Sequence, residues 1–343
     1  MNPHSSTVEE SDRGVLRRAT VERVGLRGRR APGDAAFRML TLGCGLVVLV
    51  VLGLIALSTT REAWPVLRHR TGNFLFTQTW NPQAGRPLFG SLGFVYGTVI
   101  SSVVAVVFAV PVSVGIALFV TEYAPRWLRR PVVFLVDLLA AVPSVVFGLW
   151  GVLTLAPILQ HWFDRAAGVA HPIPIIGSLL SANGGGGGGS GRSLFTCGLI
   201  LALMITPIIT VITREVFETT PAGQKEAALA LGCTRWEMIR STVFPHSRHG
   251  FTGGVLLGLG RAMGETIAAA LVIGSSVQVT RHLFSPGDSM AAVIANQFGE
   301  STGDFRAALI GLGVVLFVLT IIVNLIARAI VGNAAEATGT IGR

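Results

Sequence analysis

Six apolar stretches, each about as long as a membrane is thick, constrain this chain more than any other feature. A helix needs about 20 residues to cross the ~30 Å apolar core of a bilayer. The stretches cover roughly residues 39–58, 91–120, 132–155, 194–213, 251–275 and 305–331. Runs such as LGCGLVVLVVLGLIAL do not alternate apolar with polar residues, as the strands of a membrane barrel do. The sequence therefore predicts an all-α polytopic membrane protein with about six transmembrane helices.

Positive charge is distributed unevenly over the segments between these spans. Arg306 and Arg328, near the two ends of the last span, are counted with the segments next to it. With the N-terminus placed in the cytoplasm, 18 of the 27 Lys and Arg residues then lie inside, 8 lie outside, and Arg261 lies within a span. Lys and Arg accumulate on the cytoplasmic side of membrane proteins. The distribution of the positive charge therefore indicates a topology with both termini in the cytoplasm. The net charge of +9 is explained by this topology rather than by a nucleic-acid partner.

The spans divide the chain into successive regions. We expect a basic cytoplasmic tail (1–38), a first transmembrane helix (39–58), an extracytoplasmic loop (59–90), a core of five helices (91–331) and a C-terminal tail (332–343).

Two outer loops carry distinctive residues. Trp64 and Trp80 in the first loop are expected to anchor the chain at the membrane interface, the alternative being a docking surface. The glycine-rich run at 184–191 in the second loop is typical of a flexible tether, and we assign it no function.

The longest cytoplasmic connection, residues 214–250, contains strong helix signals. Thr220 is expected to cap a first helix with Pro221 in its first position, since both residue types are common there. Gly232 suits the left-handed position after that helix, where a side chain with a Cβ is strained. A second short helix is expected to end before Pro245. The pattern predicts a helix–turn–helix outside the lipid that docks on a partner.

The same loop reads EAALALGCTRWEMIRSTVFP. This stretch resembles the cytoplasmic signature of ABC-importer permeases, which combines Glu-Ala-Ala with a Gly and a more distant Pro. The matching residues here are Glu226, Ala227, Ala228, Gly232 and Pro245. In that family the segment is the coupling helix, which sits in a groove of a separate ATPase subunit. The resemblance implies the type I ABC-importer permease fold.

Three further stretches narrow the family. They read ALFVTEYAP, AAVPSVVFGLWG and GLGRAMGETIAAALVIG. They look like the C-type subunit of the phosphate-specific importer permease, over roughly residues 90–330. The A-type subunit and permeases for sulfate or molybdate are the alternatives. The resemblance implies ATP-driven import of inorganic phosphate across a bacterial cytoplasmic (inner) membrane, with this chain forming half of the pore. The implied partners are a related A-type permease in a heterodimer, two ATPase subunits and an extracytoplasmic phosphate-binding protein.

The chain carries no nucleotide-binding signature of its own. A P-loop ends in Gly-Lys-[Ser/Thr], but the one lysine of this chain, Lys225, follows Gln224. We therefore expect no enzymatic activity and no cofactor, with ATP used by the partner subunit. We also expect no metal site, because His246 and His249 have no carboxylate or thiolate at ligand spacing.

Two opposite charges interrupt the fifth span. Arg261 lies about ten residues, or roughly 15 Å, into it, where a central Arg costs roughly 2.5–3.5 kcal/mol. Glu265 follows at i+4, which in a continuous helix places both side chains on one face. One interpretation is a structural ion pair. The favoured interpretation is substrate translocation, in which the Arg261 guanidinium binds phosphate oxygens and Glu265 prevents permanent trapping.

Other residues in the spans are assigned structural roles. Gly254 and Gly258 are spaced by four, as are Gly260 and Gly264, which lets helices approach closely or leaves room for a polar path. Asp137, Asn324 and Glu122 are expected to serve packing or hydrogen bonding.

Two other protein classes compete with the permease. A secondary transporter driven by an ion gradient leaves the ordered 214–250 loop unexplained. A membrane-embedded enzyme would use Asp137, Glu265 or a histidine as acid or base, but the sequence has no nucleophile–base motif.

Overall fold

The computed structural model describes residues 32–70, 74–82, 88–162, 191–280 and 282–339, and nearly all regular structure there is helical. The chain forms two units, Met1–Ile55 and Ala56–Arg343. The first unit contains the beginning of α2 (Pro32–Pro65), on which the large apolar side chains are exposed. A long helix with exposed apolar side chains is typical of a span that faces lipid.

Five helical segments in the described part of the chain are long and apolar enough to cross a membrane. They are Ala36–Arg68, Leu92–Tyr123, Ser144–Trp162, Leu194–Glu218 and Gly303–Ala329. The spans predicted at 39–58, 91–120, 194–213 and 305–331 each fall within or largely within one of these segments. The prediction of an all-α polytopic membrane protein is confirmed.

The third predicted span, 132–155, is wrong as a single helix. α4 (Arg126–Ala141) ends at Val142, whose backbone is extended (φ −66°, ψ 127°), and α5 (Ser144–Trp150) begins a new helix. Pro143 causes the break, because its ring disfavours helical backbone at the preceding residue. A π-helical turn, η3 (Gly151–Leu155), follows, and the helix continues to Trp162.

The fifth predicted span, 251–275, is also broken. α11 (Phe244–Gly264) ends where Glu265 takes extended backbone (ψ 128°), and the short α12 (Ile267–Val272) follows. Gly264 is a poor helix former, so breaking the helix there costs little. α12 packs beside α5, where a Cβ added to Gly148 would lie 2.9 Å from the Cα of Ala268. The stretch 251–275 is apolar enough to form one span, but the close packing of α12 beside α5 favours two separate helices.

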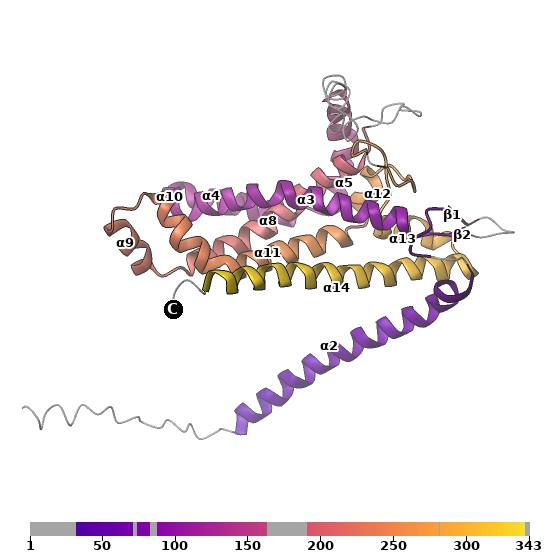
Figure 1. Cartoon of the computed structure of the whole chain (residues 1–343), viewed down its shortest axis with the longest axis horizontal. Helices are drawn as coiled ribbons and strands as arrows, with labels where there is room; N and C mark the ends of the chain where they lie inside the picture. Colours follow the sequence, from indigo (N-terminus) through magenta and orange to yellow (C-terminus); the bar gives the residue numbers. More distant parts are fainter. Residues whose placement is uncertain (1–31, 71–73, 83–87, 163–190, 281, 340–343) are drawn as a thin grey trace, which may run out of the picture. The chain divides into compact units, whose positions relative to one another are not determined.

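Three helices form the centre of the second unit: α3 (Leu92–Leu118), α8 (Leu194–Glu218) and α11 (Figure 1). A Cβ added to Gly198 of α8 would lie 2.5 Å from Cγ1 of Val104 in α3, so glycine permits the close approach. The hydroxyl of Ser113 donates a 3.0 Å hydrogen bond to the carbonyl of Thr206. Such bonds satisfy polar groups that bulk water does not reach. α14 (Gly303–Gly339) packs against α11.

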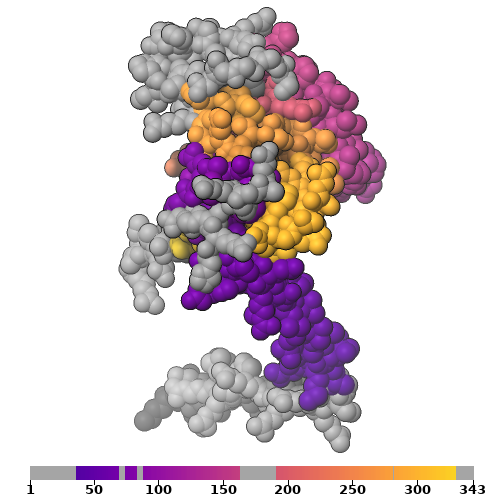
Figure 2. Space-filling view, turned by 90° about the vertical axis from the view of Figure 1, so that its right-hand side faces the viewer, coloured from indigo at the N-terminus to yellow at the C-terminus, as the bar shows by residue number. Residues whose placement is uncertain are grey.

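A second apolar cluster surrounds two short strands, β1 (Trp80–Asn81) and β2 (Leu88–Phe89), which pair antiparallel. It also takes side chains from the π-helical turn η1 (Val66–Arg70), from α13 (Met290–Gln297) and from α14. A 3₁₀ turn, η5 (Phe298–Glu300), connects α13 to the segment before α14. Figure 2 shows a purple surface, from the part of the chain that includes the strands, next to orange and yellow surfaces from its C-terminal part.

Trp80 belongs to this cluster, so its prediction as a membrane anchor is wrong. Its indole N–H donates to Oε1 of Gln297 at 3.2 Å. Its ring makes edge contacts, with centroids 5.0–6.2 Å apart, to Phe89, Phe94 and Phe305. These neighbours come from distant segments and give the ring a packed apolar site. Trp64 is 51% exposed, and the Arg68 guanidinium lies 5.8 Å from its ring centroid, which leaves Trp64 available as an anchor.

Parts of three predicted regions lie outside the described residues. These are residues 1–31 of the basic tail, residues 184–190 of the glycine-rich run, and residues 340–343 at the C-terminus. The tail predicted to begin at 332 continues as helix in α14 to Gly339.

Candidate functional site: an exposed helical loop and a basic groove

The loop at 214–250 forms helices as predicted, but the first helix begins differently. α9 (Ala222–Ala230) follows Pro221, which itself occupies the cap position, so the assignment of Thr220 as the cap is wrong. Thr220 is only 5% exposed, and its hydroxyl has no hydrogen-bond partner among the described residues. Its side chain is taken into the protein interior, where it does not cap the helix.

The turn after α9 confirms the prediction for Gly232. Gly232 has φ +86°, a left-handed conformation that glycine adopts without strain. Thr234 then caps α10 (Arg235–Met238), in a capping box in which the Thr234 side chain and Glu237 exchange hydrogen bonds with each other's backbone N–H. Hydrogen bonds from the Thr234 backbone and side chain lower the pKa of Glu237. The turn between α9 and α10 is therefore held by hydrogen bonds on both sides of Gly232.

Pro245 does not end the second helix, so that prediction is wrong. α10 runs into a π-helical turn, η4 (Ile239–Val243), and this turn runs directly into α11, where Pro245 is the second residue. The N–H of Phe244 reaches back five residues to the carbonyl of Ile239. The widened turn shifts the hydrogen-bond register directly before Pro245, so the residue without an N–H follows a turn in which the regular helical ladder is already interrupted.

The motif residues of α9 face two ways. Glu226 and Ala227 are exposed, whereas Ala228 packs on a cluster that includes Phe217 and Ile239. Large apolar side chains are exposed beside the motif, at 43%, 86% and 58% for Leu229, Leu231 and Trp236. We call Glu226, Ala227, Leu229, Leu231 and Trp236 the coupling surface. Sequence reasoning missed Leu231 and Trp236, although large apolar residues in a loop outside the membrane are a signal that could have found them.

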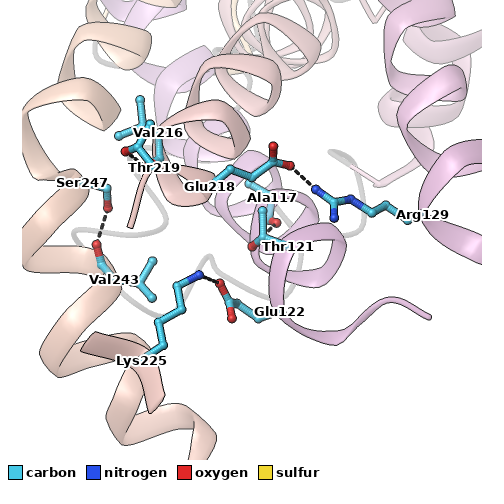
Figure 3. A network of polar contacts seen from close by, with 10 residues as sticks. All are labelled: Ala117, Thr121, Glu122, Arg129, Val216, Glu218, Thr219, Lys225, Val243 and Ser247. Atoms are coloured by element: carbon cyan, nitrogen blue, oxygen red, sulfur yellow. Dashed lines mark hydrogen bonds and ion pairs between the residues drawn. The ribbon is translucent and has the colours of Figure 1, made fainter. Parts of the chain in front are cut away.

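One ion pair joins this region to the bundle, and a second joins two helices of the bundle beside it (Figure 3). Nζ of Lys225 in α9 lies 2.5 Å from Oε1 of Glu122, in the π-helical turn η2 (Phe119–Tyr123) that follows α3. Arg129 near the start of α4 pairs with Glu218 at the end of α8. The Lys225 and Glu122 side chains are only 20% and 10% exposed, so water screens their attraction less than at an open surface. α9 is thereby connected to the end of α3.

A groove of about 920 Å³ is lined by residues of α8, α11 and α14. Its polar lining residues are His249, Thr252, Arg261, Asn324 and Arg328, and the others are Ile208, Gly253, Leu256, Leu257 and Gly260. Among the described residues no carboxylate lines it. Arginine side chains without a carboxylate beside them, on a partly apolar wall, make a positive field that attracts anions.

Arg261 and Glu265 do not form the pair that their spacing predicted. Arg261 is in the last turn of α11 and is exposed into the groove, whereas Glu265 follows the end of the helix and is half-buried. Among the ion pairs of the described residues, none joins the two side chains. The i+4 rule fails because the helical repeat stops at Gly264, between the two residues.

The four glycines of α11 that the sequence pairs by their spacing divide into two kinds. A Cβ added to Gly254 would lie 3.0 Å from Ile212, and one added to Gly258 would lie 2.8 Å from Ile209, both in α8. A Cβ added to Gly260 or Gly264 would meet no atom within 4 Å. The first pair therefore permits helix packing, as predicted, and the second pair faces open space.

The remaining candidate residues are dispersed. Asp137 is exposed on α4, Asn324 lines the groove, and Glu122 pairs with Lys225. His249 lines the groove while His246 is exposed near the start of α11. Within the described ranges, no three His, Cys, Asp or Glu side chains are grouped as a metal site requires.

Comparison with known proteins identifies the family of the chain. Residues 109–334 match the family described as binding-protein-dependent transport system inner membrane component. The chain is 42% identical over 325 residues to the phosphate transport system permease protein PstC of Mesorhizobium japonicum, which covers 94% of this chain and 95% of that protein. It is 42% identical to PstC of Xylella fastidiosa, and the alignment covers 88% of this chain and 91% of that protein. It is 41% identical to PstC 2 of Mycobacterium tuberculosis, and the alignment covers 88% of this chain and 92% of that protein.

The fold also matches a solved transporter. The crystal structure of a bacterial alginate ABC transporter in complex with an alginate-pentasaccharide-bound periplasmic protein superposes with a TM-score of 0.56 at 14% identity, covering 90% of this chain and 99% of that chain. At this identity the likeness concerns the fold alone. Sequence and fold together show that the chain belongs to the binding-protein-dependent transport system inner membrane components, and within them to the PstC-type permeases.

Proposed function

We propose that this chain is the membrane-spanning permease subunit of an ATP-driven importer of inorganic phosphate in a bacterial cytoplasmic membrane. The observation that carries the proposal is the groove that holds Arg261 and is lined by no carboxylate among the described residues. The names of relatives that share about 40% of their residues with this chain support phosphate as the substrate. The chain supplies half of the pore, and a related A-type permease supplies the other half.

Arg261 binds phosphate during translocation. Its guanidinium has donors that match phosphate oxygens, and its exposure into the groove leaves it accessible to a passing anion. Glu265 lies just beyond the end of α11, on extended backbone. This position frees it from the helical register, and we assign it the role of approaching Arg261 after phosphate has left. Transport requires such a competitor, because a permanent Arg–phosphate complex would block the path.

The coupling surface docks on an ATPase subunit. Leu231 is 86% exposed and Trp236 58% exposed, in a segment outside the membrane-spanning helices. Apolar side chains of this size at a surface mark a protein interface. ATP is bound and hydrolysed by two partner subunits, and an extracytoplasmic phosphate-binding protein delivers the substrate. This permease therefore needs no cofactor and performs no catalysis of its own.

The test is phosphate uptake by cells carrying the complete transporter with Arg261→Gln. Loss of a charged hydrogen-bond partner is worth about 1.5–3 kcal/mol, so we expect uptake to fall about 10- to 100-fold. Arg261→Lys should fall less, since it keeps the charge and loses the fork of donors. Arg130→Gln, an exposed Arg on α4 outside the groove, is the matched control and should transport normally.

The membrane amount of each variant and its co-purified ATPase are measured alongside. Normal uptake by Arg261→Gln would remove Arg261 from the phosphate path. Competition by sulfate and molybdate in the same assay separates a phosphate importer from a permease for another oxyanion. Co-purification of wild type and Leu231→Asp tests the docking, because an aspartate in an apolar interface should release the ATPase.

A further inference from the structure

The groove extends well beyond Arg261. His249 lies on the same helix, α11, twelve residues earlier, and Asn324 and Arg328 lie one turn apart on α14. Twelve helical residues span about 18 Å, more than half the thickness of a membrane core. The groove therefore runs along α11 and connects Arg261 to a second group of polar side chains.

The direction of this extension follows from the chain. His249 is five residues from the start of α11, which continues directly from the coupling segment through η4. Arg328 is 25 residues beyond Gly303, or about 37 Å along α14, so it lies near the end of that span. Since α11 packs against α14, these two ends meet on the side of the coupling surface. The second polar group thus lies at the cytoplasmic mouth of the groove.

Arg328 has the properties of a site for an anion. It is exposed into the groove, and no ion pair or hydrogen bond with another described residue engages it. Asn324, one turn before it, adds an amide donor on the same face. Guanidinium and amide groups together suit the oxygens of a tetrahedral anion.

The space in front of these residues is open within the chain. A Cβ added to Gly253 or Gly260, both in the groove lining, would meet no atom within 4 Å. Neither glycine is therefore needed for packing inside this subunit. Their lack of side chains keeps the groove wide between the two arginines.

We propose that Arg328 and Asn324, with His249 opposite, form a second oxyanion station at the cytoplasmic mouth, which receives phosphate from Arg261 before release. This inference rests on the proposed function and adds the exit site to it. The ligand is a phosphate group, supplied by the translocated anion. A lipid headgroup offers the same chemistry, and the experiment below distinguishes the two sources.

The test uses the complete transporter, reconstituted in vesicles with its ATPase and binding protein, and measures phosphate uptake against the concentration of loaded binding protein. Arg328→Gln should lower the maximal rate about tenfold, the equivalent of one lost charged contact. The concentration for half-maximal uptake should change less than twofold, because capture occurs at the opposite membrane face. Arg328→Lys should recover most of the rate, and Asn324→Ala should lower it by a smaller factor.

Two comparisons make the result decisive. Arg130→Gln removes an exposed Arg from α4, outside the groove, and should keep the wild-type rate. Vesicles of phosphatidylcholine alone are compared with vesicles that contain phosphatidylglycerol. If Arg328 serves the translocated anion, Arg328→Gln is slow in both, while wild type is equally fast in both. If wild type in phosphatidylcholine falls to the rate of Arg328→Gln, the site binds anionic lipid and the proposal is overturned.

The second station and the proposed function fail in different ways. If Arg261→Gln abolishes uptake while Arg328→Gln transports normally, only the second station is wrong. If both variants transport normally, the groove is not the phosphate path. ATPase co-purification with Arg328→Gln establishes that the complex has assembled, which is expected because the side chain is exposed.

Discussion

At the residue scale, the glycines of α11 show that one residue type serves opposite purposes along one helix. Gly254 and Gly258 admit Ile212 and Ile209 of α8, so a side chain there collides with the core. Gly260 follows Gly258 by two residues and therefore lies on the other side of the helix, where it faces the groove and an added Cβ would meet no atom within 4 Å. The spacing of four in the sequence is the same for both pairs, but the neighbour differs.

We predict different outcomes for Gly258→Leu and Gly260→Leu. Gly258→Leu overpacks the contact with Ile209, at a cost of about 1–3 kcal/mol, and should reduce the amount of subunit in the membrane. Gly260→Leu should preserve or slightly raise stability, since glycine is about 1 kcal/mol worse than other residues inside a helix. It should nevertheless slow phosphate uptake by narrowing the groove. Quantitative blotting and uptake check this, and equal membrane amounts for both variants would contradict it.

Asp288 gives a prediction about pH. It lies in the loop between α12 and α13, is 5% exposed, and burial raises its pKa from 3.8 to about 6, against the lowering effect of the Ser289 N–H bond. The folded state thus binds the proton more tightly than the unfolded state. The stabilisation is fully present below pH ~4 and is lost as the pH rises through about 6, on the order of 3 kcal/mol in total.

Asp288→Asn should remove this dependence, because the amide oxygen can still accept the 2.8 Å bond from Ser289 while carrying no charge. The melting temperature of the purified wild-type complex should fall from pH 5 to pH 7.5, and that of the variant should fall less. At pH 7.5 the variant should melt higher. Glu300→Gln, an exposed carboxyl nearby in sequence, is the control and should follow wild type. Parallel curves for wild type and Asp288→Asn would show that Asp288 does not titrate as described.

At the element scale, the coupling segment is anchored to the bundle as well as exposed to a partner. Leu231 directly follows α9 and is exposed. Lys225 in α9 forms an ion pair with Glu122 in η2 (Figure 3). The helix that bears part of the coupling surface is therefore linked directly to the end of α3. The π-helical turn η4 carries a second connection, since it joins α10 to α11 without a break and α11 bears Arg261.

Charge reversal tests the anchor. Lys225→Glu places two carboxylates together and should lower uptake about tenfold or more, since losing a charged hydrogen bond costs about 1.5–3 kcal/mol. ATPase co-purification should persist, because the coupling surface itself is unchanged. Adding Glu122→Lys restores an ion pair and should recover much of the uptake. A double variant no better than Lys225→Glu would show that the ion pair does not transmit motion.

At the scale of the whole molecule, the orientation of the chain in the membrane can be measured with its own cysteines. Cys44 lies on the apolar α2, Cys197 is buried, and Cys233 is partly exposed in the coupling segment. Cys233 is therefore a natural reporter for the side of the membrane on which that segment lies.

We predict that a membrane-impermeant maleimide labels Cys233 in inside-out vesicles and not in right-side-out ones. Thr302→Cys, made together with Cys233→Ser, should show the reverse pattern, because Thr302 is exposed in the segment before α14. The physical reason is the excess of Lys and Arg in the segments assigned to the cytoplasm. Labelling of Cys233 in right-side-out vesicles would show that the chain has the opposite orientation and that the coupling surface lies outside the cell.

Much of this fold could be predicted from local properties of the chain. Apolar length predicts most of the spans, because every backbone group in a bilayer needs a partner and a helix supplies it within one segment. Gly232 could be placed in its left-handed turn for an equally local reason. The prediction failed at Trp80 because its side chain packs on residues far away in the sequence. It failed at Thr220 and Pro245 because α9 begins one residue later than expected and a π-helical turn carries α10 into α11.

By itself the sequence determined the helical class, the permease family and the presence of Arg261 in an otherwise apolar stretch, since hydropathy, motif spacing and charge are properties of the chain. Only the tertiary structure decided that α11 ends between Arg261 and Glu265, and that α14 brings Asn324 and Arg328 to the same groove. Helical periodicity assumes an unbroken helix, and the packing of α12 beside α5 breaks it. Contacts between helices depend on how their surfaces fit together, and no single segment contains that information.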